Sequence, residues 1–143
     1  MKKKLSEILA VSAIFEALTH KHYTNFSLSF KIARAAKELA SQKDFYIGEE
    51  RKIIELYAQK DENGQVKIVN GNQISFKDQE DALKFNKDIN DLASTEVDIF
   101  EPIEIRMSDF KEGEMDLTPN DLIMLDGFII FVDEEESRAV EAN

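Results

Sequence analysis

The sequence predicts a mainly helical α+β fold with one long helix, a β-hairpin, one or two further strands and a short C-terminal helix. Three observations support this prediction. Apolar residues recur with helical spacing over residues 4–19 and 27–59, apolar segments flank a Gly-containing turn within residues 65–76, and a complete helix-start signal occupies Leu117–Leu122. The chain has 143 residues, the size of one ordinary domain.

We divide this single domain, residues 1–143, into three parts. These are an N-terminal helix with its connection (1–26), a core (27–132) and an acidic peripheral tail (133–143). The chain contains no Cys, which excludes disulfides, Cys-based zinc sites and thiol catalysis.

The first predicted helix spans residues 4–19. Its apolar face consists of Leu5, Ile8, Leu9, Ser12, Phe15 and Leu18. The lysines that precede it give a superficial likeness to a signal peptide, but Glu7 and Glu16 bracket the apolar run. The run is also far shorter than the roughly 20 apolar residues of a membrane span. We therefore expect neither a cleaved signal nor a membrane helix.

The second predicted helix covers residues 27 to about 59. Its apolar row repeats every seven residues and consists of Ile32, Leu39, Tyr46 and Ile53. The neighbouring row is interrupted by Lys43 and Glu50. Because Gly48 costs about 1 kcal/mol relative to Ala in a helix, we expect a bend or break near it. Gly64 is suited to the left-handed turn that follows the helix.

The register of the predicted hairpin follows from which side chains must share a face. A two-residue turn would place polar residues opposite apolar ones. A three-residue loop, Asn70-Gly71-Asn72, instead pairs Ile68 with Ile74 and Val66 with Phe76. We therefore predict the three-residue loop, with the apolar face covered by a helix and the polar tip available for contact.

Three further elements follow the hairpin. Asp78 should cap a helix over residues 79–93, whose apolar face is Ala82, Phe85, Ile89 and Leu92. Residues 97–107 alternate as a strand with Val97, Ile99, Ile103, Ile105 and Met107 on one face. Because Pro102 cannot donate to a ladder, this strand should lie at an edge or bend there. Gly127 should end a helix over 119–126, and residues 128–132 form a short strand or a helical continuation.

The start of helix 119–126 is the most specific local signal in the chain. Thr118 can accept a hydrogen bond from the first turn, Pro119 has no N–H to lose, and Asp121 can bond back to the cap. Leu122, paired with Leu117 as a hydrophobic staple, should pack into the core. We therefore predict a structural role for Thr118.

Charge is distributed unevenly along the chain. Residues 1–60 carry 11 basic against 7 acidic side chains, and residues 61–143 carry 7 against 22. Such asymmetry favours a partner or self-assembly with complementary charge, and solubility alone explains it equally well. The run Glu134-Glu135-Glu136 could also mimic a phosphate backbone.

No motif for a specific chemistry accompanies these elements. His20 and His22 have no marked third metal ligand, and the acidic loop 109–116 lacks the ligand spacing of an EF-hand. Phosphate loops and nucleophile elbows are absent from the sequence. The basic side chains that could line a helix face for nucleic acid are few: Lys31, Arg34, Lys37 and Lys43. We therefore expect no enzyme, no cofactor, no metal and no direct nucleic-acid binding.

Six short segments have a recognisable order and spacing: Phe30–Arg34, Lys60–Gly64, Phe85-Asn86, Glu96–Ile99, Glu101–Ile103 and Leu117–Leu122. Together they span roughly residues 27–125, and this part of the chain resembles a family of small bacteriophage and prophage proteins of unknown function. The resemblance implies a viral origin and a small accessory or structural role. It implies no catalytic residues.

We therefore expect a non-enzymatic phage protein that works by protein–protein contact, including self-association, in virion assembly or as a virion component. Its place would be the cytoplasm of an infected bacterium or the virion. The candidate partner-binding residues are Asn70, Gly71, Asn72, Glu134, Glu135 and Glu136. The alternative is an acidic inhibitor, or nucleic-acid mimic, of a host or defence enzyme.

Overall fold

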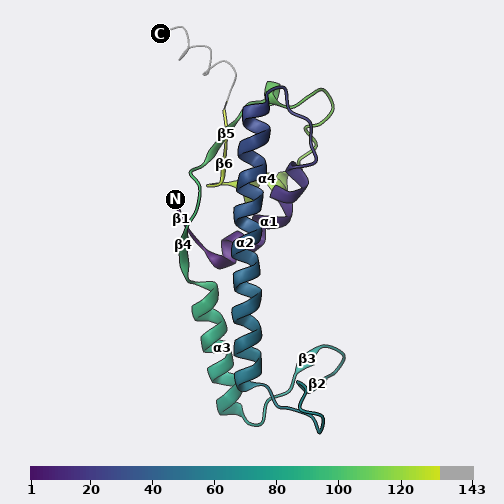
Figure 1. The fold of residues 1–143 in the computed structure, drawn as a ribbon, viewed down its shortest axis with the longest axis vertical. Coiled ribbons are helices and arrows are strands. Elements are labelled where there is room, and N and C mark those ends of the chain that lie inside the picture. Colours follow the sequence, from purple (N-terminus) through teal and green to yellow (C-terminus); the bar gives the residue numbers. More distant parts are fainter. Residues whose placement is uncertain (133–143) are drawn as a thin grey trace.

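A single 32-residue helix, α2 (Phe26–Tyr57), runs along the molecule and organises the other elements around it (Figure 1). The computed structural model describes residues 1–132. Helix α1 (Leu5–Leu18) packs on the first part of α2, α3 (Gln79–Ala93) packs along its second part, and α4 (Pro119–Leu125) contacts α1. The architecture is α+β, as predicted.

The strands form three separate pairs in the described part of the chain. Strand β1 (Lys2–Lys4) pairs antiparallel with β4 (Glu96–Asp98), and β2 (Ile68–Val69) pairs antiparallel with β3 (Gln73–Ile74). Strand β5 (Ile103–Ile105) pairs parallel with β6 (Ile129–Phe131). Residues 128–132 thus supply a strand and no helical continuation.

The prediction of one strand over residues 97–107 is wrong. Strands β4 and β5 belong to different pairs, and Pro102 lies between them because it cannot continue a ladder. Met107, expected on the inward face, begins a short 3₁₀ turn (Met107–Asp109) and is 63% exposed.

We name two regions of the molecule. The head comprises residues 1–40 and 94–132, and the arm comprises residues 41–93. The buried core lies in the head and consists of Leu5, Ile8, Val11, Phe15, Leu18, Tyr23, Leu28, Ile32, Ala35, Leu39, Ile99, Ile103, Ile105, Phe110, Leu125, Phe128 and Ile129. Within the described residues, Ala58 is the one fully buried apolar side chain of the arm.

The buried face of α1 is close to the predicted one. Five of the six predicted positions are buried, but Leu9 is half-buried and Val11 is buried in addition. The face that meets α2 and α4 is therefore turned toward Val11.

Helix α2 continues through Gly48 without interruption, so the expected break there is wrong. Apart from its chain neighbours and the backbone of α2 itself, nothing lies within 4 Å of the place where a Cβ would stand on Gly48. Packing against α3 along the second part of α2 outweighs a propensity cost of about 1 kcal/mol. In the predicted apolar row, Ile32 and Leu39 are buried in the head, whereas Tyr46 and Ile53 are half-buried in the arm, where α3 covers one side only.

The hairpin has the predicted three-residue loop and pairs Ile68 with Ile74. Asn70 and Gly71 adopt positive φ angles of 51° and 89°, which a tight loop of this kind requires. The predicted pairing of Val66 with Phe76 is wrong. Residues 58–60 enter between the two ends of the hairpin and bridge to both of these residues instead. The predicted helical cover of this face is present only in part: the Phe76 ring lies 5.1 Å from the Phe85 ring of α3, whereas Ile68 is 58% exposed.

Both predicted helix caps are present. The Asp78 carboxylate accepts a hydrogen bond from the backbone N–H of Asp81 at 2.9 Å. Thr118 Oγ1 accepts from Asp121 N–H, and the Asp121 carboxylate accepts from Thr118 N–H, both at 3.1 Å. Leu125 is fully buried, but Leu122 is 37% exposed, so the predicted burial of Leu122 is wrong.

Candidate functional site: a groove beside the long helix

A shallow groove of about 1270 Å³ lies in the head between the first part of α2 and residues 100–109, a segment that includes β5. Two separate parts of the sequence therefore form its walls. The α2 wall carries polar and charged side chains along residues 25–42. The opposite wall adds the apolar residues Phe100 and Pro102 to a set of charged ones.

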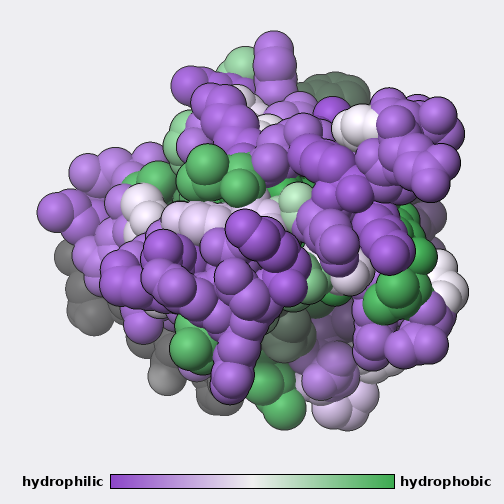
Figure 2. All heavy atoms as spheres, turned by 90° about the horizontal axis from the view of Figure 1, so that it is seen from below, coloured by the Kyte–Doolittle hydropathy of each residue, from purple (hydrophilic) through white to green (hydrophobic). Residues whose placement is uncertain are grey.

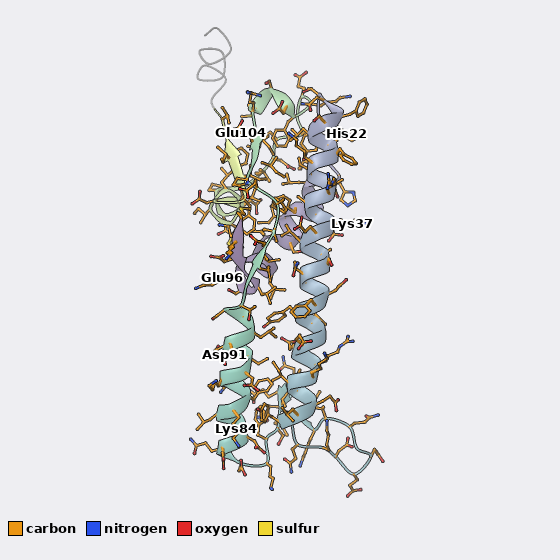
Figure 3. All side chains as sticks on the ribbon, turned by 60° about the vertical axis from the view of Figure 1, so that its left-hand side comes forward. His22, Lys37, Lys84, Asp91, Glu96 and Glu104 are labelled. Carbon is orange, nitrogen blue, oxygen red and sulfur yellow. The ribbon has the colours of Figure 1, made fainter. Side chains whose placement is uncertain are left out.

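The two walls have mirrored charge. Among the lining residues, the α2 wall carries three basic side chains and one acidic side chain: Lys31, Arg34, Lys37 and Glu38. The opposite wall carries three acidic side chains and one basic side chain: Glu101, Glu104, Asp109 and Arg106. Lys37 on α2 and Glu104 on β5 are labelled in Figure 3. The basic and acidic halves of the sequence thus meet at this groove.

Exposed aromatic rings lie on the α2 side of the groove. Phe30 lines the groove and is 63% exposed, and Phe26, one turn earlier, is 91% exposed. The guanidinium carbon of Arg34 lies 5.6 Å from the centroid of the Phe30 ring, a cation–π contact within one helical turn. This arrangement leaves large apolar area next to an oriented cation.

One end of the groove is held in place by Asp109. Its carboxylate accepts from the backbone N–H of Arg106 at 2.8 Å and from the Asn25 side-chain amide at 3.3 Å. Its carbonyl accepts from Thr24 N–H at 2.8 Å. Asn25 in turn caps α2, because its side-chain oxygen accepts from Leu28 N–H at 2.7 Å. The start of α2 and the opposite wall are therefore fixed relative to each other.

Several charged side chains along the groove have no ion-pair partner among residues 1–132. Lys31, Arg34 and Lys37 make no ion pair with any described residue, although five other lysines do: Lys21, Lys52, Lys60, Lys84 and Lys87. Glu104 likewise has no ion pair in the described part, and the Nε atom of Arg106 is buried there without a hydrogen bond. Buried donors normally have a partner, so the groove has capacity to bind a charged ligand.

His22 and Lys21 connect the turn after α1 to the acidic loop of the head. His22 Nδ1 lies 2.8 Å from Glu114 Oε1, and this contact holds the pKa of Glu114 below its usual range. Lys21 pairs with Asp116 and lowers the pKa of that carboxyl. Burial raises the pKa of the neighbouring Tyr23, and the charge of Glu114 adds to this effect. Among residues 1–132, no group of three or more His, Asp or Glu side chains is placed to hold a metal.

The predicted partner-binding residues do not belong to the groove. Asn70, Gly71 and Asn72 are exposed at the hairpin tip of the arm, at the opposite end of the molecule from the head (Figure 1). Viewed from that end, apolar side chains form separate patches on a mainly hydrophilic surface (Figure 2). Glu134, Glu135 and Glu136 lie outside the described residues. Of the four predicted basic side chains of α2, Lys43 does not line the groove.

Sequence reasoning missed the groove itself. The sequence did contain a sign of its α2 wall. Phe26, Phe30 and Arg34 recur every four residues on the side of the helix away from Ile32 and Leu39, and this spacing indicates an aromatic face that does not belong to the core. The sequence contained no sign of the groove's other wall, because the approach of residues 100–109 to α2 depends on long-range packing.

No protein family model matches this chain, and no curated protein sequence or solved structure is significantly similar to it. The resemblance to small phage proteins therefore stays a prediction. No helix among the described residues is both long and apolar enough to cross a membrane.

Proposed function

We propose that this chain is a non-enzymatic, phage-encoded protein that acts by protein–protein contact, in virion assembly or as a component of the virion. The observation that carries the contact role is the pair of exposed aromatic rings, Phe26 and Phe30, beside the charged groove. The phage origin is supported by the six ordered segments of the sequence that resemble small phage proteins.

The chemistry of this surface is that of an interaction site. Aromatic residues and Arg are enriched where protein interfaces gain most of their binding energy, because each can bury a large area against the partner. Single exposed apolar side chains are ordinary on any surface. Here two rings, a stacked guanidinium and a groove adjoin one another, which is the pattern expected of a contact patch.

The experiment compares two aromatic truncations of α2. A Phe26→Ala/Phe30→Ala variant should bind the structural proteins of its phage at least about tenfold more weakly, as expected when hot-spot residues are lost. Phe45→Ala is the matched control, because Phe45 is 51% exposed on the same helix but does not line the groove. Equal binding by the unmodified chain, the Phe26→Ala/Phe30→Ala variant and the Phe45→Ala control would contradict the proposed surface.

Neighbouring genes offer an independent test. Portal, capsid or tail genes alongside would support virion assembly. A cluster of small early genes, together with salt-sensitive binding to a basic host enzyme, would favour the inhibitor hypothesis instead. In that case, neutralising Glu134, Glu135 and Glu136 should weaken binding more than the aromatic truncations do.

A further inference from the structure

We propose that the occupant of the groove is a second copy of this chain, so that two copies associate about a two-fold axis, with the α2 wall of each copy against the residue 100–109 wall of the other. This inference rests on the proposed contact function and names the partner. In a two-fold interface the same patch serves both copies, and every contact occurs twice. A patch can only do this if it is complementary to itself.

The charges of the groove meet that condition. The α2 wall carries three basic and one acidic side chain, and the opposite wall carries three acidic and one basic side chain. When the α2 wall of one copy faces the residue 100–109 wall of the other, opposite charges meet. The two-fold axis then brings the remaining two walls together in the same way.

The same composition disfavours other occupants. An anionic polymer or acidic peptide attracted to Lys31 and Arg34 would also meet Glu101 and Glu104 across the groove. A basic partner would meet the α2 cations. A partner complementary to both walls must present acidic side chains to the α2 wall and basic side chains to the residue 100–109 wall. A second copy of this chain carries both kinds of surface.

The apolar side chains add the burial that charge alone does not supply. Phe30, with the Arg34 guanidinium stacked on it, can pack against Phe100 and Pro102 of the other copy, since all four line the groove. Phe26, which is 91% exposed, extends this contact by one helical turn. Lys31, Arg34 and Glu104, which make no ion pair among residues 1–132, then gain oppositely charged partners.

The test reverses the charge of each wall separately. The first variant, Lys31→Glu/Arg34→Glu, makes both walls acidic. The second, Glu101→Lys/Glu104→Lys, makes both walls basic. Glu101 pairs with the Met1 amino group, but its side chain is 83% exposed, so this change should cost the fold little. Lys43→Glu and Glu96→Lys make the same kinds of change outside the groove and serve as matched controls.

Light scattering and sedimentation should show a dimer of the unmodified chain that weakens with added salt. Each wall variant should dimerise at least about tenfold more weakly, because like charges then face each other. An equimolar mixture of the two variants should recover a dimer, since both contacts become complementary again. A chain with both walls reversed should recover its own dimer, and the two controls should behave like the unmodified chain. Circular dichroism melts confirm that each variant is folded.

Four results would overturn the inference. A monomeric unmodified chain that still binds phage proteins through Phe26 and Phe30 would refute self-association and leave the proposed function intact. A dimer that neither wall variant weakens would place the interface elsewhere. Two weakened variants that do not recover on mixing would exclude a second copy as the occupant. A full-length chain that stays monomeric, and dimerises only when it is cut after Val132, would show that residues 133–143 and not a second copy occupy the groove.

Discussion

The head and the arm share one continuous helix but bury their side chains to different depths. In the head, α2 is covered by α1 and by the 100–109 segment, and Leu28, Ile32, Ala35 and Leu39 are buried. In the arm, α3 alone lies along α2, and α3 has no fully buried residue. The number of layers around α2, and not its own sequence pattern, therefore decides how deeply its apolar row is buried.

The arm compensates with specific contacts between few elements. The Tyr57 hydroxyl donates to the Asp88 carboxylate at 2.9 Å, and the rings of Phe76 and Phe85 lie 5.1 Å apart. Regions with few buried apolar contacts open at a lower free energy than the global unfolding transition. We therefore expect the head to carry the global stability and the arm to open locally, so the proposed interaction surface lies on the more stable region.

The substitution with the largest expected effect tests the difference in stability between the head and the arm. Phe15 is fully buried in the head and packs at 5.6 Å from the Phe100 ring and 6.3 Å from the Phe128 ring. Phe15→Ala should lower the free energy of unfolding by about 3–5 kcal/mol, because a cavity adds to the lost transfer energy. Phe85→Ala, the matched change in the arm, should cost about 1–2 kcal/mol, since less apolar area leaves water there.

Urea denaturation followed by circular dichroism measures both losses. Amide hydrogen exchange adds the regional information, because α3 amides should exchange through openings that leave α1 protected. Equal losses for the two variants, or equal protection of α1 and α3, would show that head and arm form one cooperative unit.

Local signals predicted the turns and caps of both regions. The Thr118 and Asp78 caps depend on residues three positions apart, and the Asn70-Gly71-Asn72 loop was predicted from apolar side chains within residues 66–76. All three are present in the structure. Such signals need no knowledge of the remaining chain, which is why a single sequence is enough to find them.

Contacts between distant segments were not predictable in this way. Lys2–Lys4 has no strand-like alternation, yet it pairs with β4 more than ninety residues later. Ile103 pairs in parallel with Ile129, and the groove depends on residues 100–109 approaching α2. The burial of the Ile68 and Leu122 side chains also depends on which other elements cover them. Long-range packing decides these features, and no local pattern encodes it.

The two helix caps provide the next comparison. Thr118→Ala in the head should cost about 1 kcal/mol of global stability, because one backbone N–H loses its partner and α4 carries the buried Leu125. Asp78→Ala in the arm removes an equivalent bond, but we expect much of its effect as local fraying of α3. Thermal melts and residue-resolved exchange measure the two effects.

Partner binding distinguishes a structural from a functional role for Thr118. Folded Thr118→Ala protein should bind as the unmodified chain does, since Thr118 does not line the groove. Lost binding in fully folded protein would show that Thr118 belongs to the interaction surface.

The third-largest expected effect is a stabilising substitution in the arm. Gly48 lies within α2 with open space around its missing side chain. Gly48→Ala should raise the stability of the arm by about 0.5–1 kcal/mol, because Ala loses less backbone entropy in a helix. Slower exchange of arm amides, with head amides unchanged, is the expected measurement. Slower exchange of both regions would indicate that the arm limits global unfolding.

The smallest expected effect is an acid sensitivity confined to the head. The contact with His22 lowers the pKa of Glu114 below its usual value of 4.5. A carboxyl with a lowered folded-state pKa stabilises the fold above its usual pKa, and this contribution is lost as the pH falls through the folded-state pKa.

Glu114→Gln removes the contribution, so the stability difference between the unmodified chain and this variant should shrink as the pH is lowered from about 6 to about 3. Glu112→Gln, at an exposed neighbour in the same loop, makes the same chemical change and is the matched control. Because the His22 side chain is 70% exposed and Glu114 is only half-buried, solvent screens their contact, so the difference should be small and should narrow further in high salt. Urea melts at several pH values measure it, with exchange of head and arm amides recorded in parallel. A pH-dependent difference that appears in α3 amides as strongly as in those of residues 20–25 would contradict the confinement of this effect to the head.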